Sequence, residues 1–158
     1  MTHPARNESE EERLDRNLNE MLQELRVALP GVQVLFAFLL AVPFQQNFTS
    51  VTPFQKSVYF ITLLLTAVST ALFIAPTAYH RMTFRLQQKD RLVRFGNRSA
   101  IGGVICLALA MTGAVVMITD VLYDGTAAAI TGSLVMMVFI FLWMLLPLAG
   151  RRGAADED

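Results

Sequence analysis

The sequence predicts an all-α integral membrane protein in which four transmembrane helices follow a cytoplasmic amphipathic helix. Of its 158 residues, 54% are hydrophobic and only 16% are charged, whereas soluble domains carry about a quarter of charged residues. The charges are also segregated, because residues 27–44, 57–79, 99–119 and 125–150 contain none. Apolar runs of about 18 residues or more are typical of membrane-spanning helices. Four of them leave too little polar sequence to cover their surfaces in water.

The amphipathic helix is expected over residues 9–27, after a disordered segment at 1–8. Ser9 and Glu12 have the spacing of a capping box, which begins a helix. Leucines and Met21 then recur at helical spacing, with polar side chains on the opposite face. Pro30 is expected to bend or restart the helix, because proline removes a backbone donor. The first 26 residues lack the basic and apolar regions of a cleavable signal, so the first span must direct insertion itself.

The membrane domain is expected over residues 28–149. Its four spans are predicted at about 28–45, 56–79, 100–123 and 126–149. Asp124 and Gly125 make a tight turn between the last two spans. A disordered acidic tail is expected over residues 150–158.

The distribution of basic residues predicts the orientation. Twelve of the 13 Lys and Arg residues precede the first span, separate the second from the third, or follow the fourth. Lys56 alone falls on the other side. The positive-inside rule therefore places both ends of the chain in the cytoplasm, and we expect a multi-pass protein of a bacterial plasma membrane.

Small residues recur every four positions in the third span, at Gly102, Cys106, Ala110 and Ala114. Lipid gives helices no hydrophobic reason to associate, so close backbone approach has to hold them together. The stripe therefore predicts a helix contact. That contact either packs the helices of one chain or forms an oligomer interface.

Two polar side chains within or near the spans are candidates for function. Gln33 is an amide inside the first span, where it needs a partner. It either hydrogen-bonds across helices or lines a polar pathway. Asp120 is a carboxylate near the end of the third span, and a carboxylate in the membrane region suggests a functional role. Its closeness to Asp124 and the outer turn equally suggests that it reaches interfacial water.

The segment after the second span is basic. His80 and Arg81 end that span, where they either anchor it at the interface, sense pH or bind a lipid headgroup. The wider cluster is expected to contact anionic headgroups, with Arg81, Arg85 and Lys89 spaced to share one helix face. It consists of Arg81, Arg85, Lys89, Arg91, Arg94 and Arg98. Nucleic acid is not expected as a partner, because the segment is short and held against the membrane.

Motifs for enzymatic chemistry are missing from the sequence. Two histidines and one cysteine provide no metal-ligand cluster. We find no phosphate-binding glycine loop, nucleotide fingerprint, nucleophile elbow or kinase motif. We therefore expect no cofactor and no enzymatic activity.

Several stretches resemble one family. They are RLDRNLNEMLQELRV at 13–27, GVQVLFAFLL at 31–40, Phe54-Gln55, and APTAYHR at 75–81. Over about residues 11–145 the chain resembles a group of small actinobacterial membrane proteins with a domain of unknown function. Some members are labelled as sodium:proton antiporters. The resemblance implies a bacterial plasma membrane location, and it implies no catalytic or transport residues.

These observations favour a non-enzymatic polytopic protein that acts as a homo-oligomer or as an accessory subunit of a membrane complex. The alternative is a small ion or proton transporter or channel, in line with the antiporter label. A coupled transporter usually has an acidic or histidine residue deep in the membrane, and this sequence has none at such a depth.

Overall fold

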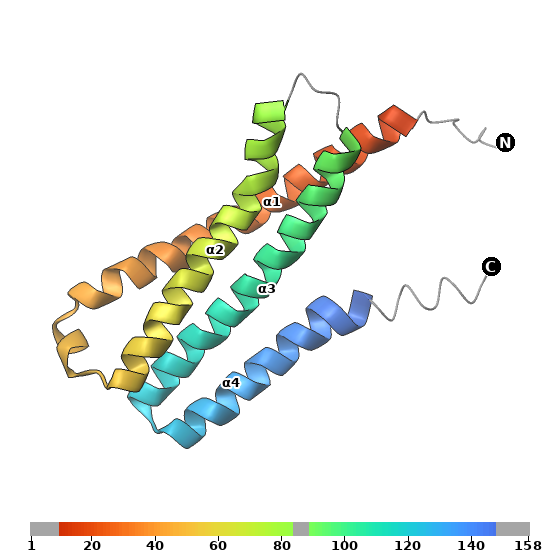
Figure 1. Cartoon of the computed structure of the whole chain (residues 1–158). Helices are drawn as coiled ribbons and strands as arrows, with labels where there is room; N and C mark the ends of the chain where they lie inside the picture. The colour runs from red at the N-terminus through yellow and green to blue at the C-terminus, as the bar shows by residue number, and fades with distance from the viewer. Residues whose placement is uncertain (1–9, 84–88, 148–158) are drawn as a thin grey trace.

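The computed structural model describes residues 10–83 and 89–147 (Figure 1). Within them the chain forms helices and short connections only, which confirms the all-α prediction. The long helices are α1 (Glu10–Ala41), α2 (Pro53–Thr83), α3 (Lys89–Leu122) and α4 (Gly125–Ile140). The 3-10 helices η1 (Val42–Phe44) and η2 (Gln46–Ser50) join α1 to α2, and the π-helix η3 (Phe141–Leu145) continues α4.

Four segments of these helices are long and apolar enough to cross a membrane: Arg16–Phe44, Pro53–Met82, Arg91–Leu122 and Gly125–Leu145. This is the arrangement of a multi-pass membrane protein. About 20 residues suffice to cross the hydrocarbon core, but α1, α2 and α3 contain 32, 31 and 34 residues. Each of the three is therefore about 17–21 Å longer than one crossing requires.

The structure differs from the sequence prediction at the beginning of the chain. The capping box at Ser9 lies outside the described residues, but α1 runs from Glu10 to Ala41 without interruption at Pro30. No separate amphipathic helix precedes the first span. Leu25 and Val32, on either side of the proline, belong to one buried cluster with Phe73 of α2. Packing on both sides of Pro30 holds the helix together, although the proline removes one backbone hydrogen bond.

The buried side chains of α1 and α2 follow a repeat of seven residues. In α1 the buried residues Leu18, Leu25, Val32 and Leu39 are spaced by seven. In α2 the buried positions alternate in steps of four and three: Gln55, Tyr59, Thr62, Thr66, Ser69, Phe73 and Pro76. A spacing of 3.5 residues is typical of helices that pack side by side in a left-handed sense.

Glycines let α3 approach its neighbours closely. A Cβ atom on Gly103 would overlap the ring of Phe73, and one on Gly113 would overlap the hydroxyl of Thr62. Gly96 is similarly covered by Met21 of α1. The backbone of α3 therefore fits directly against side chains of α2 and α1, the kind of contact that holds membrane helices together.

Helix α4 is attached to the bundle through α3 alone among the described elements. Its buried residues are Ala128 and Gly132, and Gly132 fits against Val116 of α3. Both lie near the beginning of α4, and Figure 1 shows α4 diverging from α3 toward its other end. Ile130, Leu134, Met137, Val138 and Ile140 of α4 are apolar and exposed, which is expected of a helix that faces lipid.

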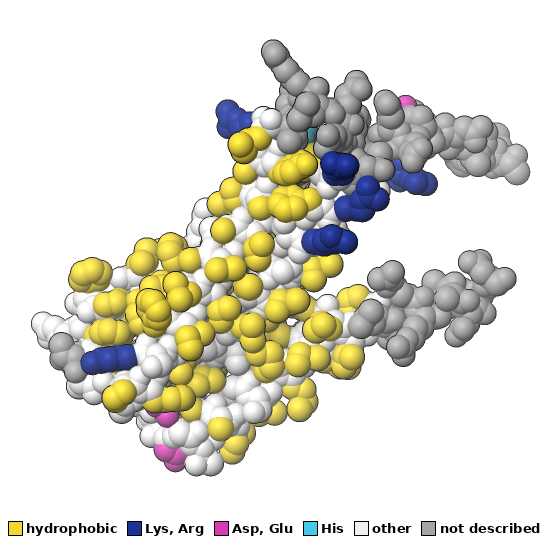
Figure 2. All heavy atoms as spheres, viewed as in Figure 1, with side chains coloured by type: hydrophobic (Ala, Val, Ile, Leu, Met, Phe, Trp, Pro, Cys, Tyr) yellow, Lys and Arg dark blue, Asp and Glu magenta, His cyan; other side chains and the backbone are white. Residues whose placement is uncertain are grey.

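The two ends of the bundle differ in charge. At the end where α2 ends and α3 begins lie the exposed Arg81, Arg91, Arg94 and Arg98, and we call it the basic end. At the other end lie Asp120 and Asp124, and we call it the acidic end. Lys56, in the first turn of α2, also lies at the acidic end. Figure 2 shows most of the basic side chains gathered at the basic end and apolar side chains along the bundle between the two ends.

The glycine contact makes a testable prediction. We expect Gly103→Ala to destabilise the protein by about 1–3 kcal/mol, the usual effect of overpacking, because the added methyl group meets the ring of Phe73. The measurement is the free energy of unfolding in mixed micelles, followed by loss of helical circular dichroism.

Gly31→Ala is the matched control, since nothing lies within 4 Å of a Cβ at that position. In an open helical position this change should stabilise α1 by up to about 1 kcal/mol. Equal effects of the two substitutions would contradict the close contact between α2 and α3.

Candidate functional site

The first residues of α2 form a capping box. Thr52 precedes the helix and Pro53 is its first residue, a favoured position for proline. The hydroxyl of Thr52 accepts a hydrogen bond from the backbone N–H of Gln55 at 3.2 Å. In return, Oε1 of Gln55 accepts one from the backbone N–H of Thr52 at 2.9 Å. Two backbone donors that the helix cannot satisfy are paired in this way.

The same glutamine joins α2 to α3. Its Nε2 donates a hydrogen bond of 2.9 Å to Oδ2 of Asp120, which lies 65 positions further along the chain. Gln55 is buried and Asp120 is half-buried. Asp120 was singled out from the sequence, but Gln55 was not. The pattern of Thr followed three residues later by Gln was the available signal for the cap, and nothing in the sequence indicated the pairing with Asp120.

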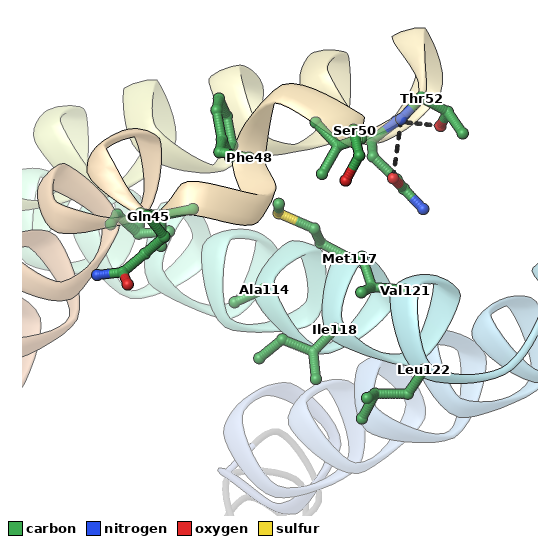
Figure 3. Close-up of a pocket in the computed structure, with 13 residues that line it drawn as sticks. Gln45, Phe48, Ser50, Thr52, Ala114, Met117, Ile118, Val121 and Leu122 are labelled. Atoms are coloured by element: carbon green, nitrogen blue, oxygen red, sulfur yellow. Dashed lines mark hydrogen bonds between the residues drawn. The ribbon is translucent and has the colours of Figure 1, made fainter.

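A cavity of about 620 Å³ opens beside this hydrogen bond at the acidic end (Figure 3). Figure 3 shows Gln45 and Phe48 on the η1–η2 connection, with Met117, Val121 and Leu122 on α3. Thr52 and Gln55 contribute polar atoms at one side, and the rest of the lining is largely apolar. The cavity holds no cluster of titratable groups, and no group of three potential metal ligands occurs among the described residues.

Tyr59 completes the connection between α1 and α2. Its hydroxyl donates a hydrogen bond of 2.9 Å to the backbone oxygen of Leu39. The residue four positions after Leu39 is Pro43, which has no N–H to offer that oxygen. The tyrosine thus satisfies a carbonyl that its own helix cannot. Its ring also lies edge-on against Phe48, with 5.2 Å between the centroids.

In the middle of α2 the hydroxyl-bearing residues Thr62, Thr66 and Ser69 are buried, and Thr70 is half-buried. Thr66 donates to the backbone oxygen of Thr62, and Thr70 donates to that of Thr66. Ser69 donates across the interface to the oxygen of Gly103 at 2.8 Å. These hydroxyls are used by the backbone, and they line none of the larger cavities.

Gln33 is exposed on a flank of α1, about a quarter turn around the helix from the buried Val32. Its amide has no hydrogen-bond partner among the residues that the structure describes. Ala37 and Leu40, which follow Gln33 on the same face of the helix, are also exposed. The structure therefore places Gln33 on an outer surface rather than between helices of the same chain.

The basic end contains the remaining candidates. His80 is half-buried and Arg81 is exposed in the last turn of α2. Tyr79 packs on Phe95 of α3, with ring centroids 5.1 Å apart. Arg91, Arg94 and Arg98 are exposed along the beginning of α3. Arg85 lies outside the described residues, and the side chain of Lys89 is not described either, so the shared face proposed for them stays a prediction.

The stripe of small residues on α3 has mixed surroundings. Ala110 is fully buried, whereas Gly102, Cys106 and Ala114 are half-buried. Gly103 and Gly113 make the closest approaches to α2. A repeat of four residues drifts around a helix relative to a contact with a 3.5-residue period, which is why the stripe coincides with the contact only in part.

Comparison with known proteins gives one match. The profile of a family of unknown function, DUF6328, matches residues 7–147. The chain belongs to this family. No curated protein and no solved structure matches it. For this DUF6328 chain, function therefore has to be argued from its own residues.

The hydrogen bond between Gln55 and Asp120 can be measured with a double-mutant cycle. We expect Gln55→Ala and Asp120→Ala to couple by about 1 kcal/mol in unfolding free energy. Hydrogen bonds to charged groups contribute about 1.5–3 kcal/mol, and solvent around the half-buried Asp120 lowers this value.

Asp124 provides the control for this cycle. Its Oδ1 accepts a hydrogen bond from the backbone N–H of Ala127 at 2.7 Å and caps α4. Asp124→Ala should cost about 1 kcal/mol and should add to Gln55→Ala without coupling. Coupling to Asp124 as strong as to Asp120 would contradict the assignment.

Proposed function

We propose that this protein is a non-enzymatic membrane subunit that associates laterally, as a homo-oligomer or with another membrane protein, through the outer face of α1. The observation that carries the proposal is the exposed Gln33 within an apolar span. A glutamine amide that faces hydrocarbon lacks hydrogen bonds, and leaving it so is costly. A neighbouring helix from a second protein can supply them.

The surroundings of Gln33 support a helix contact. Ala37 and Leu40 follow Gln33 on the same face of the helix, one and two turns further along, and both are exposed. A small residue such as Ala37 on an outer face lets another backbone come close. Leu40 adds apolar contact area. A second copy is the simplest partner, because two glutamines can bond each other across a two-fold axis.

The orientation is part of the proposal. We place the basic end in the cytoplasm of a bacterial cell, in accordance with the positive-inside rule. The exposed Arg81, Arg91, Arg94 and Arg98 would then face the anionic surface of the inner leaflet. The extra length of α1 and α3 on this side would project into the cytoplasm and present polar side chains to it.

The interface prediction concerns one side chain. We expect Gln33→Leu to weaken self-association about three- to thirtyfold, which corresponds to the loss of an interhelical hydrogen bond of about 0.6–2 kcal/mol in a membrane. The measurement is the monomer–oligomer equilibrium in lipid bilayers, followed by energy transfer between labelled copies at several protein-to-lipid ratios.

Ser133→Ala is the control. Ser133 is also exposed on a membrane helix, but its hydroxyl already donates to the backbone oxygen of Ala129 at 2.7 Å and needs no partner. Loss of association in Ser133→Ala, or none in Gln33→Leu, would contradict the proposal. A protein that is monomeric when pure but stable with another protein in native membrane discs would favour the accessory subunit.

Ion or proton transport is the second candidate. The hydroxyls of Thr66, Ser69 and Thr70 donate to backbone oxygens, so a polar pathway would have to run between copies, where we place Gln33. Flux in liposomes that contain only this protein would support the candidate if Gln33→Leu abolished it and Ser133→Ala did not. Wild-type liposomes that pass neither protons nor sodium would count against it.

A further inference from the structure

A groove of about 440 Å³ lies between α3 and α4 in the half of the bundle nearer the basic end. It opens where α4 diverges from α3 (Figure 1). Its walls are apolar and come from both helices. On α3 they include Ile101, Ile105 and Leu109, and on α4 they include Phe139, Trp143 and Met144.

The α4 wall of the groove has an unusual backbone. Phe141–Leu145 forms a π-helix in which the N–H of Leu146 bonds to the oxygen of Phe141. Such turns are rare and frequently lie at functional sites. Trp143 lies within this turn, and its ring packs on Phe139 with centroids 4.7 Å apart. The turn therefore belongs to the part of α4 that lines the groove.

The mouth of the groove is polar and charged. Asn97 of α3 and Glu24 of α1 line it at the basic end. Both also line a smaller cavity that includes Arg94. Arg98 does not line the groove itself, but it is one turn from Ile101 and two turns from Ile105, which places it at the edge of the groove face of α3. No ion pair with another described residue is formed by Glu24, Arg94 or Arg98.

We propose that this groove holds one acyl chain of a phospholipid from the leaflet at the basic end, with the headgroup phosphate beside Arg98 and a primary ammonium beside Glu24. The length of the groove fits this occupant. From Asn97 to Leu109 the helix rises by about 18 Å, close to the roughly 15 Å of hydrocarbon in one leaflet. The charges fit as well, because the negative phosphate of the headgroup lies beside the guanidinium of Arg98 and its positive ammonium lies beside the carboxylate of Glu24.

A helix of a second copy fits the groove less well, because the uncharged spans of this chain offer no counter-charge to Glu24 at the mouth. A purely anionic headgroup also fits less well, because the carboxylate of Glu24 would repel it. The surface used for self-association lies elsewhere, on the outer face of α1, so the two proposals are independent.

The test uses Trp143, the only tryptophan of the chain. The full-length protein is reconstituted in phosphatidylcholine vesicles with a minor fraction of a lipid brominated near the glycerol end of one chain, because bromine quenches tryptophan fluorescence at contact. The brominated lipids compared are phosphatidylethanolamine, phosphatidylglycerol and phosphatidylcholine. We expect phosphatidylethanolamine to be preferred about two- to fivefold, the range that an exposed ion pair supplies.

Substitutions assign the preference to the groove. Ile101→Phe fills it and should reduce quenching by all three lipids, whereas Ile61→Phe, at a similarly exposed position on α2, should change nothing. Glu24→Gln should remove the preference for phosphatidylethanolamine over phosphatidylglycerol. Arg98→Gln should weaken the excess quenching, and Arg91→Gln, two turns farther out, should not.

Three outcomes would overturn the proposal. Equal quenching by the three lipids means that Trp143 meets only bulk lipid. Preference for phosphatidylglycerol means that the mouth recognises net negative charge and that the role given to Glu24 is wrong. Quenching by none of them means that protein, such as a second copy, covers the groove.

Discussion

The contact between α2 and α3 is the interaction on which the rest of the structure depends. Hydrocarbon provides no hydrophobic force between helices, so their association relies on close packing and on satisfied polar groups. Gly103 and Gly113 provide the close approach to Phe73 and Thr62. The hydroxyl of Ser69 bonds the backbone of α3 from α2. Both α1 and α4 are then placed by their contacts with this pair.

The side chains buried between the helices differ between the basic end and the apolar region. Toward the basic end, α1 and α3 bury Leu18, Leu25 and Leu92, large side chains that the hydrophobic effect drives together in water. Within the apolar region of α2, the buried residues include Thr62, Thr66 and Ser69. One seven-residue geometry therefore continues along the helices. It buries large apolar side chains toward the basic end, and within the apolar region it buries Thr62, Thr66 and Ser69 beside Val32 and Phe73.

The sequence was sufficient to predict features that depend on local composition. Long uncharged runs predicted four spans, and Asp124 before Gly125 predicted the turn at which α4 begins. The sequence was insufficient where the structure depends on contacts between residues far apart in the chain. The continuity of α1 through Pro30 depends on Leu25 and Val32 meeting Phe73, which a local rule for proline does not include. The partner of Asp120 lies 65 positions away, and no periodicity links the two residues.

Polar interactions tie the helices together at the acidic end and leave them freer at the basic end. At the acidic end, Gln55 bonds both its own helix cap and Asp120, Tyr59 bonds the end of α1, and Asp124 caps α4. No comparable bond joins α4 to α3 near η3 among the described residues, and there the two helices diverge. Since α4 is fixed at one end only, sideways access into the bundle opens from the leaflet at the basic end. The headgroup of a lipid that enters there meets the arginines, Asn97 and Glu24, while its acyl chain reaches the apolar walls.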